Sequence, residues 1–200
     1  MFKTQNPAVV TVSKLISNFF NPLVSLIIYF VYSSYLDFTS TGALVRFLPI
    51  LLLTVLPIVI WILWNVRKGN YSNLDVSNRH QRKSLYFFIG GAITVYLIYD
   101  YVVNTTIDLI MLFLLILLFA MQASNYFIKS SMHMAFNVFV AALFFYKSPF
   151  AGLIWLGIAV AVGITRVILQ RHTPKEVLMG AAIAASVSFI YLYTAIQTQH

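Results

Sequence analysis

Cysteine is absent from this chain of 200 residues, and acidic side chains are scarce, with five aspartates and glutamates in total. Without cysteine the chain forms no disulfide bond, no thiolate nucleophile and no cysteine-ligated zinc site. Patterns that hold metal ions, such as D-x-D, H-E-x-x-H or paired carboxylates, are also missing, so the sequence predicts neither a metal site nor a cofactor. Arginine-rich arms and soluble nucleic-acid-binding motifs are missing too, which predicts no nucleic-acid partner.

Apolar side chains dominate what is present. Hydrophobic residues make up 60% of the chain and charged residues 9%, and the mean hydropathy is +0.86. A soluble globular surface cannot be built from this composition, so we predict a single integral membrane domain over residues 1–200. The net charge of +8 favours contact with anionic membrane lipids.

The apolar residues fall into segments of helical length. At the N-terminus, residues 1–21 place Val9, Val12 and Ile16 on one helical face, which predicts an interfacial helix. Seven hydrophobic segments follow, and we expect an all-α polytopic transmembrane bundle of six to seven membrane segments. The expected segments are residues 22–36, 44–66, 84–103, 107–127, 132–146, 150–165 and 177–196.

Three polar segments interrupt the apolar pattern, at residues 67–83, 129–133 and 165–176. Two hydrophobic segments separate each polar segment from the next, so all three are predicted to lie on one membrane face. Only Arg46 and Lys147 lie opposite, and the positive-inside rule therefore predicts a cytoplasmic polar face in a bacterial inner membrane. The basic residues counted on the polar face are Lys3, Lys14, Arg67, Lys68, Lys83, Arg171 and Lys175.

The third polar segment carries the residues most suited to chemistry. Arg166, His172 and Glu176, the one glutamate in the chain, lie within eleven residues. A guanidinium that is always charged, an imidazole and a carboxylate suit the binding of a phosphate, followed by nucleophilic attack or proton transfer.

These residues carry a family resemblance. Thr165–Glu176, with the pattern T-R-x5-H-x3-E, is similar to the third signature of type-2 phosphatidic acid phosphatases, S-R-x5-H-x3-D. Ser130–His133, S-S-M-H, stands where that family has P-S-G-H, its second signature. The first signature, K-x6-R-P, is altered: Asp75 occupies the lysine position before Arg82, and Arg79 is the nearest substitute cation. The resemblance extends over roughly residues 67–195.

The resemblance implies a membrane phosphatase that hydrolyses a lipid phosphomonoester or diphosphate through a phosphohistidine, without a metal ion. It implies that His172 is the nucleophile, that Glu176 orients it, and that His133 is the proton donor. The implied substrate is a lipid resembling phosphatidate or a polyprenyl diphosphate. The phosphate-binding residues expected from the resemblance are Arg166, Arg82, Arg79, Lys129 and Ser131.

Each of these residues also has a structural interpretation. Taken alone, Arg166 is better explained by the charges that commonly flank membrane segments, and His133 is explained equally well by a hydrogen bond between helices. Thr173-Pro-Lys-Glu176 has the pattern of a helix capping box, which would give the glutamate a role without catalysis. The alternative functions are therefore a non-catalytic protein that binds lipid phosphates, or a small transporter.

Overall fold

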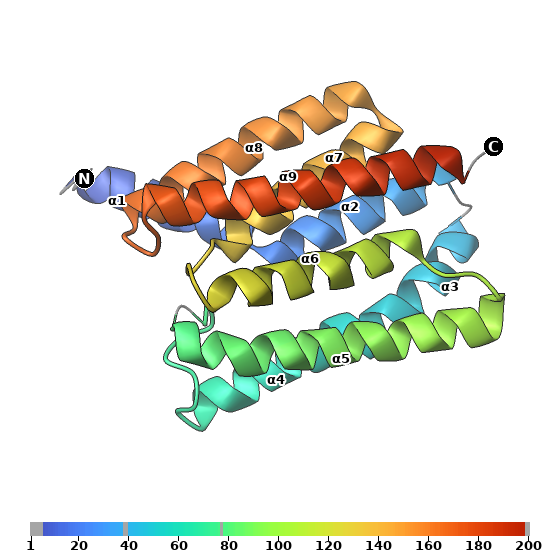
Figure 1. Ribbon diagram of the computed structural model, residues 1–200, viewed down its shortest axis with the longest axis horizontal. Coiled ribbons are helices and arrows are strands. Elements are labelled where there is room, and N and C mark those ends of the chain that lie inside the picture. The colour runs from blue at the N-terminus through green and yellow to red at the C-terminus, as the bar shows by residue number, and fades with distance from the viewer. Residues whose placement is uncertain (1–5, 38–39, 77, 199–200) are drawn as a thin grey trace. The chain divides into compact units, whose positions relative to one another are not determined.

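A computed structural model describes residues 6–37, 40–76 and 78–198, and within these ranges every regular element is helical. The predicted all-α architecture is thus confirmed, and each of the seven predicted segments coincides with helical structure (Figure 1). The elements are α1 (Pro7–Phe19), α2 (Pro22–Asp37), α3 (Ser40–Ile50), the π-helical η1 (Leu51–Val55), α4 (Leu56–Arg67), α5 (Arg79–Asn104), α6 (Leu109–Asn125), α7 (Met132–Lys147), α8 (Pro149–Ile168) and α9 (Pro174–Gln197).

The helices have the lengths and apolar character of a membrane bundle. Among the described residues, four helices are long and apolar enough to cross a bilayer: Val45–Arg67, which runs through α3, η1 and α4, together with α5, α8 and α9. A fifth span results if α1 and α2 are counted as one helix that is bent by 54°. The remaining two, α6 and α7, are shorter apolar helices of 17 and 16 residues.

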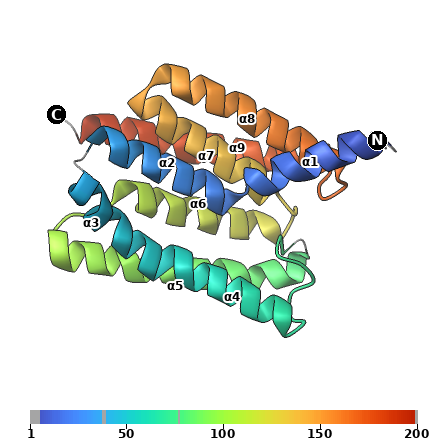
Figure 2. The ribbon, with the colours of Figure 1, turned by 180° about the vertical axis from the view of Figure 1, so that it is seen from behind.

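The chain divides into two compact units, one formed by the described parts of Met1–Ser33 and Ser124–His200, the other by Ser34–Ala123. In the first unit α7 packs against both α8 and α9, and α1 lies along α8 (Figures 1 and 2). The centre of this packing consists of Phe139, Leu143, Val162 and Ala184, all fully buried.

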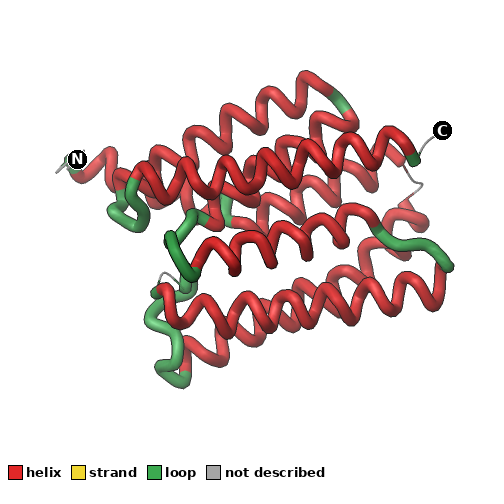
Figure 3. Tube along the Cα trace, in the orientation of Figure 1, coloured by secondary structure: helices red, strands yellow, loops and turns green. Residues whose placement is uncertain are grey.

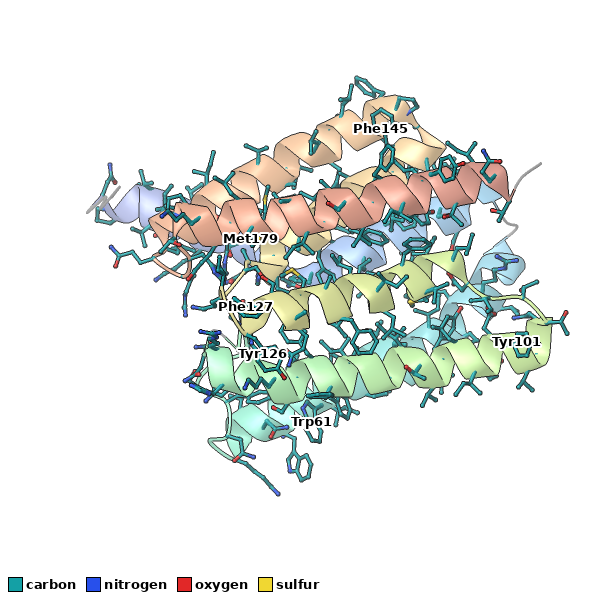
Figure 4. The ribbon with its side chains drawn as sticks, in the orientation of Figure 1. Trp61, Tyr101, Tyr126, Phe127, Phe145 and Met179 are labelled. Carbon is teal, nitrogen blue, oxygen red and sulfur yellow. The ribbon has the colours of Figure 1, made fainter. Side chains whose placement is uncertain are left out.

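α7 and α8 approach each other closely at one end of the first unit. α7 and α8 are joined at Ser148, whose side chain accepts a hydrogen bond from the N–H of Ala151 and so caps α8. Phe145 lies in α7 close to this turn (Figure 4). A Cβ atom at Gly152 would lie 2.6 Å from the Cα of Phe145, so only glycine allows this approach. α7 and α8 therefore return the chain directly to the end where the second and third signatures lie.

Two loops meet at the end of the first unit that lies opposite the turn between α7 and α8. The turn between α6 and α7 and the turn between α8 and α9 lie together, opposite the α7–α8 turn (Figure 3). The Lys129 ammonium donates to the carbonyl of Arg171 at 3.2 Å, and the N–H of Ser131 donates to the carbonyl of Glu176 at 3.0 Å. The fold thus joins the second signature to the third.

In the second unit, η1 and α4 pack against α5, and the loop between α4 and α5 folds onto them. Trp61 of α4 (Figure 4) stacks on Phe88 of α5, and the two ring centroids are 4.3 Å apart. The predicted polar loop at residues 67–83 is shorter than expected, because Asn78 accepts a hydrogen bond from the N–H of His80 and starts α5 at Arg79. Arg79 therefore lies on a helix.

Candidate active site

The turn between α8 and α9 holds two of the predicted site residues in a fixed relation. Arg166 lies in the last turn of α8, and its carbonyl accepts hydrogen bonds from the N–H groups of Arg171 at 3.0 Å and His172 at 3.2 Å. Between them Gln170 adopts a left-handed backbone conformation with φ of +53°, which costs on the order of 1 kcal/mol for a residue other than glycine. The turn therefore brings His172 back against the end of the helix that carries Arg166.

His172 and Glu176 form the hydrogen-bonded pair that the third signature predicts. The Nδ1 atom of His172 lies 2.8 Å from Oε2 of Glu176. The histidine side chain is fully buried, and the glutamate side chain is 21% exposed. Since an ionised carboxylate only accepts hydrogen bonds, Nδ1 carries the proton in this contact. The Nε2 atom of a neutral His172 then holds the lone pair, which is the state needed for nucleophilic attack.

The capping box at the start of α9 is present as predicted. The Thr173 hydroxyl accepts the N–H of Glu176 at 3.3 Å, and Oε2 of Glu176 accepts the N–H of Thr173 at 3.1 Å. The oxygen that caps the helix is the one that contacts His172. The start of α9 therefore determines where the carboxylate stands, and the structural and the chemical interpretation of Glu176 apply to the same atom.

The second signature is held at the start of α7. Ser131 is the N-cap of this helix, since its hydroxyl accepts the N–H of Met134 at 3.4 Å. Its own N–H donates to Glu176, which ties the start of α7 to the start of α9. His133 follows in the first turn of α7 and is 8% exposed. Two helix N-termini, whose dipoles favour anions, thus lie at the same end of the unit as His172.

The cations predicted to bind phosphate are distributed over both units. In the first unit, Arg166 is buried and its Nη1 donates to the hydroxyl of Ser17 at 2.9 Å, while Lys129 contacts the α8–α9 turn. In the second unit, Arg82 is buried in α5 and its Nε donates to the carbonyl of Val76 at 3.0 Å, and Arg79 is the first residue of the same helix. The phosphate-binding roles of all four cations remain predictions.

Two residues of the site were missed by the sequence analysis. Ser17 lies on α1, far from the motifs, and no pattern connects it to Arg166. Gly180 lies one helical turn after Glu176, where a Cβ atom would be 2.6 Å from the carbonyl oxygen of Ser131 and 3.2 Å from its nitrogen. A glycine at this spacing, in a helix otherwise rich in alanine, was the available signal. The start of α7 and the first turns of α9 can therefore contact each other only if residue 180 has no side chain.

Gly180→Ala is expected to force α9 away from Ser131, because the obstacle is backbone and cannot rotate aside. We expect a loss of about 1 to 3 kcal/mol in stability and a fall in any activity that depends on the contact between Gly180 and Ser131. Gly157→Ala in α8 is the matched control, since a Cβ there meets nothing within 4 Å. Thermal unfolding of both purified variants checks this, and equal melting temperatures would contradict the close contact.

Within the described residues, no group of three or more histidine, aspartate or glutamate side chains is arranged to hold a metal ion.

Comparison with known families gives a match in the C-terminal part of the chain. Residues 121–199 match the family model described as the PAP2 superfamily. The matched region contains α7, α8 and α9 with both the second and the third signature, and it begins after Arg82. Neither the curated proteins nor the solved structures contain a match to this chain.

Proposed function

Because this chain is a type-2 phosphatidic acid phosphatase-like member of the PAP2 superfamily through residues 121–199, we propose that it hydrolyses a lipid phosphomonoester or diphosphate. The family match supports a phosphatase, a hydrolase of phosphoric esters, and helices long and apolar enough to cross a bilayer support a membrane protein. The lipid substrate and the phosphohistidine intermediate are parts of the proposal. The observation that carries it is the contact of 2.8 Å between His172 and Glu176.

In the first proposed step, Nε2 of His172 attacks phosphorus and the bond to the leaving oxygen breaks. His133 donates a proton to that oxygen, so that a neutral lipid alcohol or a protonated lipid phosphate departs. Glu176 accepts the hydrogen bond from Nδ1–H and stabilises the positive charge that develops on the imidazole ring. In the second step, water attacks the phosphohistidine, its proton returns to His133, and inorganic phosphate leaves His172 in its original state.

Positive charge is needed around the transferring phosphoryl group, whose oxygens carry the negative charge of the transition state. Arg166 and Lys129 supply it in the first unit, and the N-termini of α7 and α9 add their dipoles. Ser131 retains its hydroxyl hydrogen as a donor, because its oxygen acts as acceptor in the α7 cap. Arg79 and Arg82, in the second unit, stay phosphate ligands that the resemblance predicts, and the proposed substrate is a phosphatidate-like or polyprenyl diphosphate-like lipid.

Phosphate release from a panel of lipids by the purified protein tests the function. Phosphatidate and a polyprenyl diphosphate form the two arms, and the variant His172→Ala is the negative control. Release by wild type alone is expected. Binding of these lipids without any release would replace the phosphatase with a non-catalytic lipid-phosphate-binding protein, and neither binding nor release would favour a transporter.

We expect the activity to survive chelation by EDTA and to be blocked by vanadate. The proposed chemistry depends on histidines and fixed cations, and vanadate resembles the phosphoryl group that these residues would hold. The measurement is the rate of phosphate release with each reagent. A rate that falls in EDTA and returns with magnesium would mean that a metal ion takes part.

The cytoplasmic location of the polar face also remains a prediction. Ser72 lies exposed in the loop between α4 and α5, and the chain has no cysteine of its own. Ser72→Cys is therefore expected to escape a membrane-impermeant thiol reagent in intact cells and to react after lysis. Labelling in intact cells would place this loop outside.

A further inference from the structure

Arg166 has an unusual environment for a phosphate-binding residue. Arg166 is only 2% exposed, and its Nη1 atom donates a hydrogen bond to the hydroxyl of Ser17, which is 1% exposed. The two residues are 149 positions apart in the sequence and meet where α1 lies along α8. A guanidinium is planar and rigid, so a hydrogen bond at one nitrogen restricts the orientation of all its N–H groups.

α1 turns two serine side chains toward the protein. Ser13 and Ser17, one helical turn apart, are buried, whereas Val12, Leu15 and Phe19 are exposed. Of the apolar residues that predict an interfacial helix, Val9 and Val12 are exposed and Ile16 is half-buried, so they do not form the main contact of α1 with α8. The buried face of α1 is the serine face, and this is what brings a hydroxyl to Arg166.

A second contact holds the end of α1 close to Ser17 against α7. The chain breaks between α1 and α2, and the carbonyl of Phe20 at the break accepts a hydrogen bond of 2.9 Å from Nδ2 of Asn137 in α7. The same nitrogen donates to the carbonyl of His133 at 2.8 Å, and Oδ1 of Asn137 accepts the hydroxyl of Ser25 at 3.0 Å. The end of α1 is thus attached to α7 one turn beyond His133.

We propose that Ser17 is a positioning residue of the active site, which orients the Arg166 guanidinium for the phosphate. This inference rests on the proposed function, because it takes Arg166 as a phosphate ligand. Ser17 lies outside the region that matches the family model. The N-terminal helix therefore contributes to a site whose motifs all lie elsewhere in the chain.

The test compares Ser17→Ala with Ser13→Ala. Both changes remove one buried hydroxyl from the same face of α1, but only Ser17 bonds to Arg166. We expect Ser17→Ala to lower kcat/KM for the lipid and to weaken vanadate inhibition, each by about tenfold to a hundredfold, as for a hydrogen bond to a charged group. Ser13→Ala should stay within about twofold of wild type, and Ser17→Thr, which keeps the hydroxyl, should recover most of the loss.

Each rate is divided by the amount of folded protein, which size-exclusion chromatography measures. The rise in melting temperature on addition of vanadate is measured for the same samples. Wild-type kinetics in Ser17→Ala, equal losses in both alanine variants, or no recovery in Ser17→Thr would overturn the proposal. If wild type releases no phosphate but shows a vanadate shift that Ser17→Ala reduces, the proposed function fails and the positioning role stands. No turnover and no vanadate shift in wild type would overturn both.

Discussion

His172→Ala is expected to abolish phosphate release, with a residual rate about 10⁴-fold or more below wild type. The proposed reaction forms its covalent bond at Nε2 of this residue, so removal of the ring removes the chemical step. Substrate binding should persist, because Arg166 and Lys129 remain. The measurements are phosphate release and lipid binding by the same purified sample.

A second substitution at the same position removes Nε2 but keeps the hydrogen bond to Glu176. His172→Asn retains an N–H near the Nδ1 position that can still donate to Glu176, but it has no atom at the place of Nε2. We expect this variant to fold like wild type and to be as inactive as His172→Ala. Turnover above roughly one per cent of wild type in His172→Asn would mean that His172 is not the nucleophile.

Glu176→Gln is expected to fold normally while its rate falls by about 10²- to 10⁴-fold. Glutamine also serves at the third position of a capping box, so the hydrogen bonds with Thr173 and the start of α9 should survive. The change removes the negative charge 2.8 Å from His172. That charge matters most when the imidazole becomes positive in the transition state, so kcat should suffer more than KM.

Thr173→Ala is the matched comparison, because it removes the other half of the same capping box. It should cost about 1 kcal/mol of stability and leave the charge beside His172 in place. The expected pattern is therefore a lower melting temperature with a smaller loss of rate. Wild-type turnover in well-folded Glu176→Gln protein would leave the helix cap as the whole explanation of Glu176.

The parts of the structure that the sequence predicted are those determined by neighbours in the chain. Long apolar segments gave the helices, and Thr173 with Glu176 gave both the start of α9 and the contact with His172, which is four residues away. Hydropathy also predicted the membrane bundle, although the exact start of α5 required the local cap at Asn78. The spacing of apolar residues and the capping residues of a helix are local properties, so they can be read directly from the sequence.

The parts that escaped prediction depend on contacts between distant segments. The hydroxyl of Ser17 and the bare backbone at Gly180 become meaningful only when α1 meets α8 and α9 meets Ser131. Nothing in the spacing of α1 indicates that its serines face inward, because apolar residues can face lipid in a membrane. In water the hydrophobic face would have been buried, but a lipid environment removes that rule.

The connectivity of the first unit has a consequence for biosynthesis. Ser17 is translated 149 residues before its partner Arg166, a delay on the order of ten seconds at ordinary rates of synthesis. During that time α1 and α2 lie in the membrane without α8. A neutral serine tolerates this, because its hydroxyl can bond to a carbonyl of its own helix, as Thr11 does with Pro7. The charged arginine follows in α8, when the serine that accepts its hydrogen bond is already in place.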